Sequence, residues 1–180
     1  MANFCGNCGT ALLGEDPKTC SVCLTKHYLN PLPVAVAVLP VVENGETLGA
    51  VGVLRSKTSS IGAGKWGFPG GFLNLNENFS EGAARELLEE TGIRVDPSKG
   101  QTIDTRISSN GANILVFIQF PALSLRDVLA ATPDLKEVDD VNIVNNETDF
   151  AFSTHHAIFD LFVKPQKTPK KPLSARRKIL

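Results

Sequence analysis

The stretch GGFLNLNENFSEGAARELLEETGI, residues 70–93, restricts this 180-residue chain more than any other. Helical periodicity predicts a helix from about Ser80 to Thr91, with the Ser80 hydroxyl as N-cap and Gly92 as its end. At about 100° per residue, the helix has an apolar side and an acidic side. The acidic side carries Glu86, Glu89 and Glu90.

These three carboxylates repel one another because residues three and four apart on a helix are neighbours. Arg85 is the only basic residue beside them in the sequence. Clustered hard oxygen ligands, without thiolate or imidazole, suit Mg²⁺ or Mn²⁺. Such an ion bridges a diphosphate and helps to deprotonate a water that attacks phosphorus. The helix therefore predicts a site for a divalent cation and a phosphorylated substrate.

The four cysteines form two Cys-x2-Cys pairs near the start of the chain, and their members are Cys5, Cys8, Cys20 and Cys23. In a reducing compartment such pairs bind metal more often than they form disulfides. Two such turns close a tetrahedral shell of four sulfurs around Zn²⁺, which is the saturated arrangement of a structural site. We therefore expect a small zinc ribbon. Two disulfides, a redox pair or His27 as a substitute ligand are the alternatives.

Charge is distributed unevenly along the chain. Residues 164–180 contain seven basic and no acidic residues, and because the whole chain has a formal charge of −1, residues 1–163 carry −8. The acidic part is expected to repel nucleic acid unless a cation intervenes. The basic end and the ribbon are candidates for a weak nucleic-acid contact, although such charge runs are usually just solvated.

The longest apolar run, VAVAVLPVV at residues 34–42, is about half of what a membrane-spanning helix needs. No secretory signal is visible at the start, so we expect a cytoplasmic protein without a membrane partner. A homodimer is compatible with the sequence, which does not determine the oligomeric state.

Residues 34–42 and 48–55 are predicted to be strands joined by a hairpin at Gly45, and extended sequence returns at 101–107 and 113–120. A last helix is expected over 154–163. Strand groups separated by helices indicate an α/β or α+β domain with a covered sheet. The Gly62-x-Gly64-x-x-Gly67 match to a dinucleotide fingerprint is rejected because Pro69, and not a helix, follows it.

The stretch Gly71-x5-Glu77-x7-Arg85-Glu86-Leu87-x-Glu89-Glu90-x-Gly92-Ile93 resembles the Nudix box at every specified position. The chain is similar to Nudix hydrolases over about residues 33–163. The resemblance implies an α/β/α sandwich around a mixed sheet and hydrolysis of a nucleoside diphosphate linked to another moiety. We expect a zinc ribbon over residues 1–30, a Nudix domain over 31–164 and a basic, disordered tail over 165–180.

The same resemblance assigns roles to single residues. Glu86, Glu89 and Glu90 would coordinate Mg²⁺ or Mn²⁺, with the carbonyl of Gly70 as a further ligand, and Glu86 would also orient or deprotonate the attacking water. A pair formed by Arg85 and Glu77 would brace the loop and orient the carboxylates. An acid outside the box completes the site in many relatives. Glu137 is the first candidate and Asp140 the second, and a solvated loop charge is the alternative for both.

The substrate is less well determined. The start of the chain resembles short zinc-ribbon Nudix proteins of the NADH and FAD pyrophosphatase type, which favours a dinucleotide such as FAD or NADH, or ADP-ribose. However, the only tryptophan is Trp66, before the box, where NADH pyrophosphatases carry one after it. The alternatives are a nucleotide-sensing or nucleic-acid-binding protein on a Nudix scaffold, or a hydrolase of nucleotide-capped RNA ends.

Overall fold

The apolar run at residues 34–42 forms two strands in different sheets. In the computed structural model, which describes residues 4–133 and 138–164, the strands are β3 (Leu32–Val38) and β4 (Pro40–Glu43). Pro40 has no N–H with which to continue a ladder on both sides, and the chain changes sheets at this point. The expectation of one continuous strand was therefore wrong.

Both sheets are mixed. The first has the order β7-β3-β9-β8, in which β3 runs parallel to β9 and the other neighbours are antiparallel. The second has the order β10-β4-β5-β11, with β6 also paired to β5. Their further strands are β5 (Glu46–Arg55), β6 (Trp66–Gly67), β7 (Gly70–Phe72), β8 (Gln101–Ile107), β9 (Asn113–Gln119), β10 (Leu123–Ser124) and β11 (Val138–Val144).

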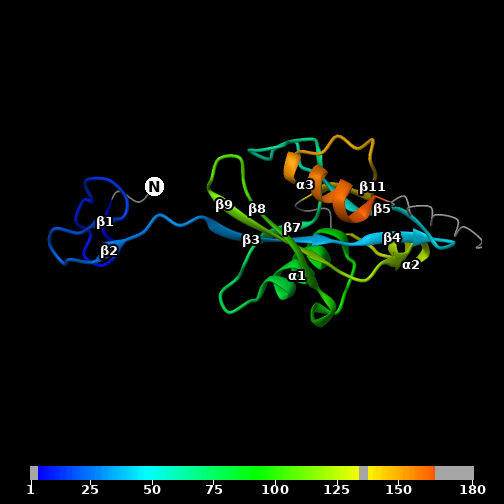
Figure 1. Ribbon diagram of the computed structural model, residues 1–180, viewed down its shortest axis with the longest axis horizontal. Coiled ribbons are helices and arrows are strands. Elements are labelled where there is room, and N and C mark those ends of the chain that lie inside the picture. Colours follow the sequence, from blue (N-terminus) through cyan, green and yellow to red (C-terminus); the bar gives the residue numbers. More distant parts are fainter. Residues whose placement is uncertain (1–3, 134–137, 165–180) are drawn as a thin grey trace, which may run out of the picture.

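Helices lie on opposite sides of the strands (Figure 1). Helix α1 (Phe79–Thr91) covers one side, where Ala83 and Leu87 pack in a buried cluster with residues of β3. Helix α3 (Ser153–Ile158) continues into a wider turn, η2 (Phe159–Val163), and packs in a second cluster with Phe117. Two short helices complete the body, namely η1 (Pro97–Lys99) and α2 (Leu125–Leu129). The predicted α/β/α architecture is confirmed.

Helix α1 begins at Phe79, and its N-cap lies two residues before Ser80, the predicted N-cap. Asn78 is its N-cap: the Asn78 side chain accepts the Glu81 amide at 3.0 Å, and the Glu81 carboxylate accepts the Asn78 amide at 2.9 Å. This reciprocal capping box satisfies two amides, so it outcompetes a cap by Ser80 alone. Gly92 ends the helix with a left-handed φ of 71°, as predicted.

The hairpin between β4 and β5 turns at Asn44 and Gly45, which have φ values of 51° and 83°. Positive φ at both central residues is typical of a turn that matches the twist of its strands. The ribbon has its own two-stranded sheet, formed by β1 (Lys18–Thr19) and β2 (Lys26–His27), at one end of the molecule in Figure 1. In the part of the chain that the structure describes, no helix is long and apolar enough to cross a membrane.

His155 is a titratable residue buried in the core. Its ring stacks on Phe68 at 5.5 Å between centroids and meets Phe117 edge-on at 5.5 Å. Its Nδ1 accepts the backbone amide of Phe68 at 3.0 Å. Burial, with a smaller contribution from the charge of Arg55, lowers the pKa of His155 to about 3.

We therefore expect the stability of the protein to depend on pH through His155. The pKa of a histidine in an unfolded chain is about 6.5. Between this value and about 3, the unfolded state binds a proton that the native state does not, so the free energy of unfolding falls as the pH falls. The slope is about 1.4 kcal/mol per pH unit.

Urea unfolding at several pH values measures this effect. His155→Asn removes the buried imidazole, so the stability difference between the wild type and this variant is expected to shrink as the pH falls below about 6.5. His156→Asn is the matched control, because His156 is the next residue and is exposed. A difference for His155→Asn that does not change with pH would contradict the prediction.

Candidate functional site

The acidic side of α1 faces the edge strand β7. The backbone N–H of Gly70 donates to Glu90 Oε2 at 3.0 Å. A side chain at Gly71 would clash with Glu86, because a Cβ there would lie 2.3 Å from Glu86 Oε1. Gly71 therefore lets β7 lie close to the carboxylates of the helix, and Gly70 lets it lie close to the backbone of β3.

Arg85 joins the carboxylates of this side. Its Nε and one terminal nitrogen donate to the two oxygens of Glu77 at 2.9 and 3.0 Å, a bidentate pair. The other terminal nitrogen donates to Glu86 Oε1 at 2.7 Å and to Glu89 Oε2 at 2.9 Å. The carbonyl of Phe72 accepts a further bond at 3.0 Å. One guanidinium thus links the loop before α1, the end of β7 and two acids of the helix.

These contacts stabilise the charged forms of the partners. The hydrogen bonds from Arg85 hold the pKa of Glu77 below its usual range, and the pairing with Glu77 raises the pKa of Arg85. Glu77 and Glu86 are largely shielded, with side-chain exposures of 13% and 12%, whereas Glu89 is 54% exposed. Arg85 is therefore paired with two shielded acids, Glu77 and Glu86, and with one exposed acid, Glu89.

Arg85 compensates only part of the negative charge at this place. The guanidinium contacts three carboxylates, those of Glu77, Glu86 and Glu89, and the carboxylate of Glu90 accepts the Gly70 amide beside them; these five side chains sum to a formal charge of −3. Their donor atoms are all hard oxygens, which suit Mg²⁺ or Mn²⁺. Chemically, the acidic side of α1 is therefore fit to hold a divalent cation and, through it, an anionic substrate.

The remaining predicted acids lie elsewhere or are not placed. Glu137 lies outside the residues that the structure describes. Asp140 is on β11, opposite Leu54 of β5, and its Oδ1 accepts the amide of Val141 at 2.8 Å. Asp140 is exposed.

The four cysteine sulfurs come together in the ribbon, all within 4.8 Å of one another. Each Cys-x2-Cys turn is followed by a residue of positive φ, Gly9 at 74° and Leu24 at 61°. The amide of each of these residues donates to the carbonyl of the first cysteine of its pair, at 2.8 and 3.0 Å. The two turns are thus built alike, and their sulfurs are compatible with a small zinc ribbon.

Hydrogen bonds to the thiols prepare part of this cluster for ionisation. The Thr25 hydroxyl lies 3.2 Å from Cys23 Sγ and, with the Thr25 amide, lowers the pKa of Cys23 to about 5. Burial raises the pKa of Cys5 to about 11. His27 Nε2 lies 3.2 Å from Cys5 Sγ. His27 is therefore next to the cluster, in contact with one of its sulfurs.

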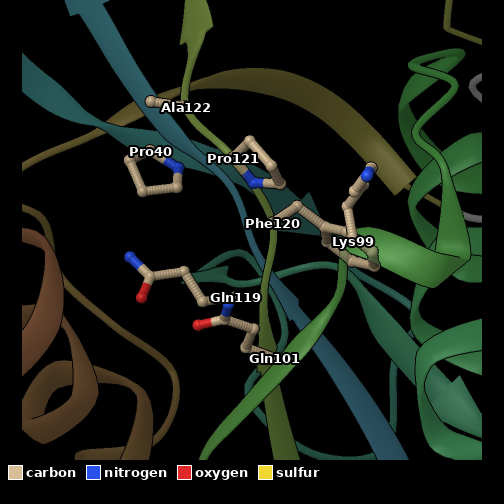
Figure 2. Close-up of a pocket in the computed structure, with 7 residues that line it drawn as sticks. All are labelled: Pro40, Lys99, Gln101, Gln119, Phe120, Pro121 and Ala122. Carbon is tan, nitrogen blue, oxygen red and sulfur yellow. The ribbon is translucent and has the colours of Figure 1, made fainter.

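A separate hollow of about 280 Å³ lies near the C-terminal end of β3 (Figure 2). Figure 2 shows the amides of Gln101 and Gln119 on one side of Phe120 and the Lys99 side chain on the other. Gln101 and Gln119 belong to β8 and β9, on the other side of β3 from β7 and its glycines. The hollow is therefore not part of the acidic site.

The comparisons with known proteins agree with this architecture. Residues 31–147 match the model of the NUDIX domain, so the chain belongs to the NUDIX family. An NAD-capped RNA hydrolase NudC of Stutzerimonas stutzeri is 28% identical over 97 residues, which are 52% of this chain and 32% of that protein. The match therefore spans about a third of the length of that relative.

Two solved structures share the fold. A NUDIX hydrolase from Nitrosomonas europaea has a TM-score of 0.64 and 24% identity, and the match covers 87% of each chain. The NUDIX domain of Shewanella oneidensis NrtR, solved with ADP ribose, has a TM-score of 0.59 and 21% identity, over 72% of this chain and 84% of that one. At these identities the likeness establishes the fold alone.

We expect Arg85→Met to destabilise the protein by about 2 kcal/mol in urea unfolding. The substitution removes the cation and leaves the shielded carboxylates of Glu77 and Glu86 without it. Adding Glu77→Gln should recover part of this loss because it removes one of those charges. Arg94→Met, just beyond the helix at an exposed position, is the control. Equal losses for Arg85→Met and Arg94→Met would contradict the assigned network.

Proposed function

We propose that this chain is a Nudix pyrophosphohydrolase that acts on a nucleoside diphosphate linked to another moiety, with Mg²⁺ or Mn²⁺. The observation that carries the proposal is the acidic side of α1, where Glu86 and Glu89 contact the Arg85 guanidinium and Glu90 contacts the backbone of β7. A structural ion pair of Arg85 with Glu77 would not need the excess of acids that Glu86, Glu89 and Glu90 bring to the same helix. A divalent cation compensates the excess and also attracts the phosphates of a substrate.

Within this proposal Glu86, Glu89 and Glu90 bind the metal. The Gly70 carbonyl is a further ligand: Gly70 directs its N–H to Glu90, and the N–H and C=O of one strand residue point to the same side of the strand. When bound, the ion neutralises charge on the diphosphate and lowers the pKa of a coordinated water. Glu86 orients or deprotonates the attacking water. Arg85 and Glu77 position the acids, and Glu137 is the proposed outer acid.

We favour a dinucleotide such as NADH or FAD, or ADP-ribose, as substrate. The relative named as an NAD-capped RNA hydrolase and the NrtR domain solved with ADP ribose support this choice, because NAD and ADP-ribose share an ADP-ribosyl group and FAD shares their adenosine diphosphate part. A nucleotide-sensing or nucleic-acid-binding protein on the same scaffold is the competing class. Such a protein would bind RNA or DNA in a salt-dependent way without turning over any nucleotide.

The decisive variant is Glu90→Gln. We expect the wild type to hydrolyse at least one of ADP-ribose, NADH and FAD with Mg²⁺ or Mn²⁺, and the variant to lose about 100-fold or more in kcat. Such a loss corresponds to about 2.7 kcal/mol, the usual scale for one charge-stabilising group in a site. Product formation and circular dichroism are measured together, so that loss of fold is recognised.

Glu81→Gln is the matched control for Glu90→Gln. It is the same change on the same helix, and glutamine can replace glutamate at this position of the capping box. We expect near-normal turnover in Glu81→Gln. Near-normal turnover in Glu90→Gln as well would refute the assignment of Glu90 as a metal ligand.

Adding NAD-capped RNA to these compounds tests whether the substrate is a free dinucleotide or a nucleotide-capped RNA. If capped RNA is the substrate, deleting residues 165–180, which carry six of the basic residues at this end, should lower the rate on NAD-capped RNA and leave that on free NADH unchanged. Equal rates with and without these residues would argue against a contact between them and RNA.

We further propose that residues 1–30 form a structural zinc ribbon and residues 31–164 the Nudix domain. The four close sulfurs support zinc, because Cys₄ sites are usually tetrahedral Zn²⁺ sites with no position open for water. Metal binding would supply the stability that a module of this size cannot obtain from a core of its own.

We expect one Zn²⁺ per chain in the wild type and none in the double variant Cys20→Ser, Cys23→Ser, as measured by metal analysis. Hydrolysis by the double variant should persist, because a saturated zinc site takes no part in the reaction. His27→Gln should keep its zinc and is the control for the alternative in which His27 is a ligand. Loss of zinc from His27→Gln would show that the four thiolates are not the complete ligand set.

A further inference from the structure

We propose that His155 is a positioning residue for the metal site, acting from the opposite side of the sheet through the backbone of Phe68 to Gly70. The proposal rests on the proposed function, since it concerns the same site. Two backbone hydrogen bonds precede this segment, at Trp66. The N–H of Trp66 donates to the Asp149 carbonyl at 3.2 Å, and the N–H of Ala151 donates to the Trp66 carbonyl at 2.7 Å.

These two bonds pair Trp66 with Phe150 in the parallel sense. The next bond of such a pair would join the Phe68 N–H to the carbonyl of Ala151. However, α3 begins at Ser153 and the chain turns away, so the Phe68 N–H needs another acceptor. A buried amide without an acceptor costs about 1–3 kcal/mol. Nδ1 of His155 accepts it, at 3.0 Å.

The position of the His155 ring is determined by its neighbours. Phe68 stacks on it with an angle of 17° between the planes, Phe117 meets its edge, and Phe152 packs against it at 5.1 Å between centroids. A ring enclosed in this way cannot rotate without displacing an aromatic side chain. A neutral ring also keeps the lone pair that the Phe68 amide needs. His155 is therefore a fixed acceptor.

The held segment leads directly to the acidic side of α1. After Phe68, the Pro69 carbonyl accepts the Ala37 amide at 2.8 Å, and the Gly70 amide donates to Glu90 at 3.0 Å. Three consecutive residues are thus each held by a different element: α3, β3 and α1. If the bond from the Phe68 amide to His155 is lost, Phe68 can shift, and Gly70 with its contact to Glu90 shifts with it.

Two amide variants test this. The Oδ1 of asparagine lies near the place of the imidazole Nδ1, whereas the Oε1 of glutamine lies near that of Nε2, so only His155→Asn keeps the acceptor in place. Both variants are neutral and polar. His156→Asn and His156→Gln are the controls, because His156 is adjacent and exposed.

The readouts are Mn²⁺ affinity, followed by electron paramagnetic resonance without substrate, and the kcat and KM of hydrolysis. We expect His155→Gln to bind Mn²⁺ about 10-fold more weakly and to lose about 10-fold in kcat, with KM nearly unchanged, the lower end of what indirect partners of metal ligands cost. His155→Asn should stay within about 3-fold of the wild type, as should both His156 variants.

The outcomes are separable from those of the proposed function. A wild type with no hydrolase activity, or an active Glu90→Gln, overturns the proposed function itself. Wild-type activity that depends on Glu90, combined with equal Mn²⁺ affinity and kcat in His155→Asn and His155→Gln, overturns the positioning role. If His155→Gln does not fold, the amide exchange of Gly70 in His155→Leu, compared with His155→Asn, replaces it. Equal exchange in these two overturns the proposal.

Discussion

The arrangement of the site depends on one side chain, the guanidinium of Arg85. It donates to Glu77 in the loop before α1, to the carbonyl of Phe72 at the end of β7, and to Glu86 and Glu89 on the helix itself. The path from β7 to α1 is also held by the capping box at Asn78, by the bond from the Gly70 amide to Glu90 and by apolar contacts. A charge that contacts strand, loop and helix together holds Glu86 and Glu89 in place on the helix. It also lowers their mutual repulsion without abolishing it, and the remaining negative charge is what the proposed metal would use.

The glycines of β7 supply the second constraint. The Gly71 Cα lies so close to Glu86 that no other residue fits without moving the carboxylate, and Gly70 is packed against the backbone of β3 on its other side. Because Gly71 carries no side chain, the backbone of β7 lies close to the acidic side of α1. His155, on the far side of the sheet, holds the same segment at Phe68. The site is therefore held from both layers of helices, although Glu86, Glu89 and Glu90 all come from α1.

Much of this could be read from the sequence, and the reasons for the exceptions are physical. Helix α1 and its acidic side follow from a 3.6-residue period, and the hairpin at Gly45 follows from its turn residues. The cap at Asn78 was missed because Ser80 is an equally good capping residue, and only the partner Glu81 distinguishes the two. Strand β11 was missed because a bulge between Val138 and Asp140 breaks its alternation.

Arg85 was expected to pair with Glu77. Its simultaneous contact with Glu86 could not be foreseen, since adjacent helical residues point in different directions. Nothing in the sequence distinguishes the buried His155 from the exposed His156, because burial is decided by the packing of α3 on distant strands.

The central claim is that the acidic side of α1 is a divalent cation site. The most direct test is a titration of the protein with Mn²⁺, without substrate, followed by electron paramagnetic resonance. The wild type is compared with a variant in which Glu86, Glu89 and Glu90 are all replaced by glutamine. We expect at least one bound Mn²⁺ per chain in the wild type that is absent from the triple variant, while both proteins show the same circular dichroism. Equal Mn²⁺ binding by the two folded proteins would contradict it.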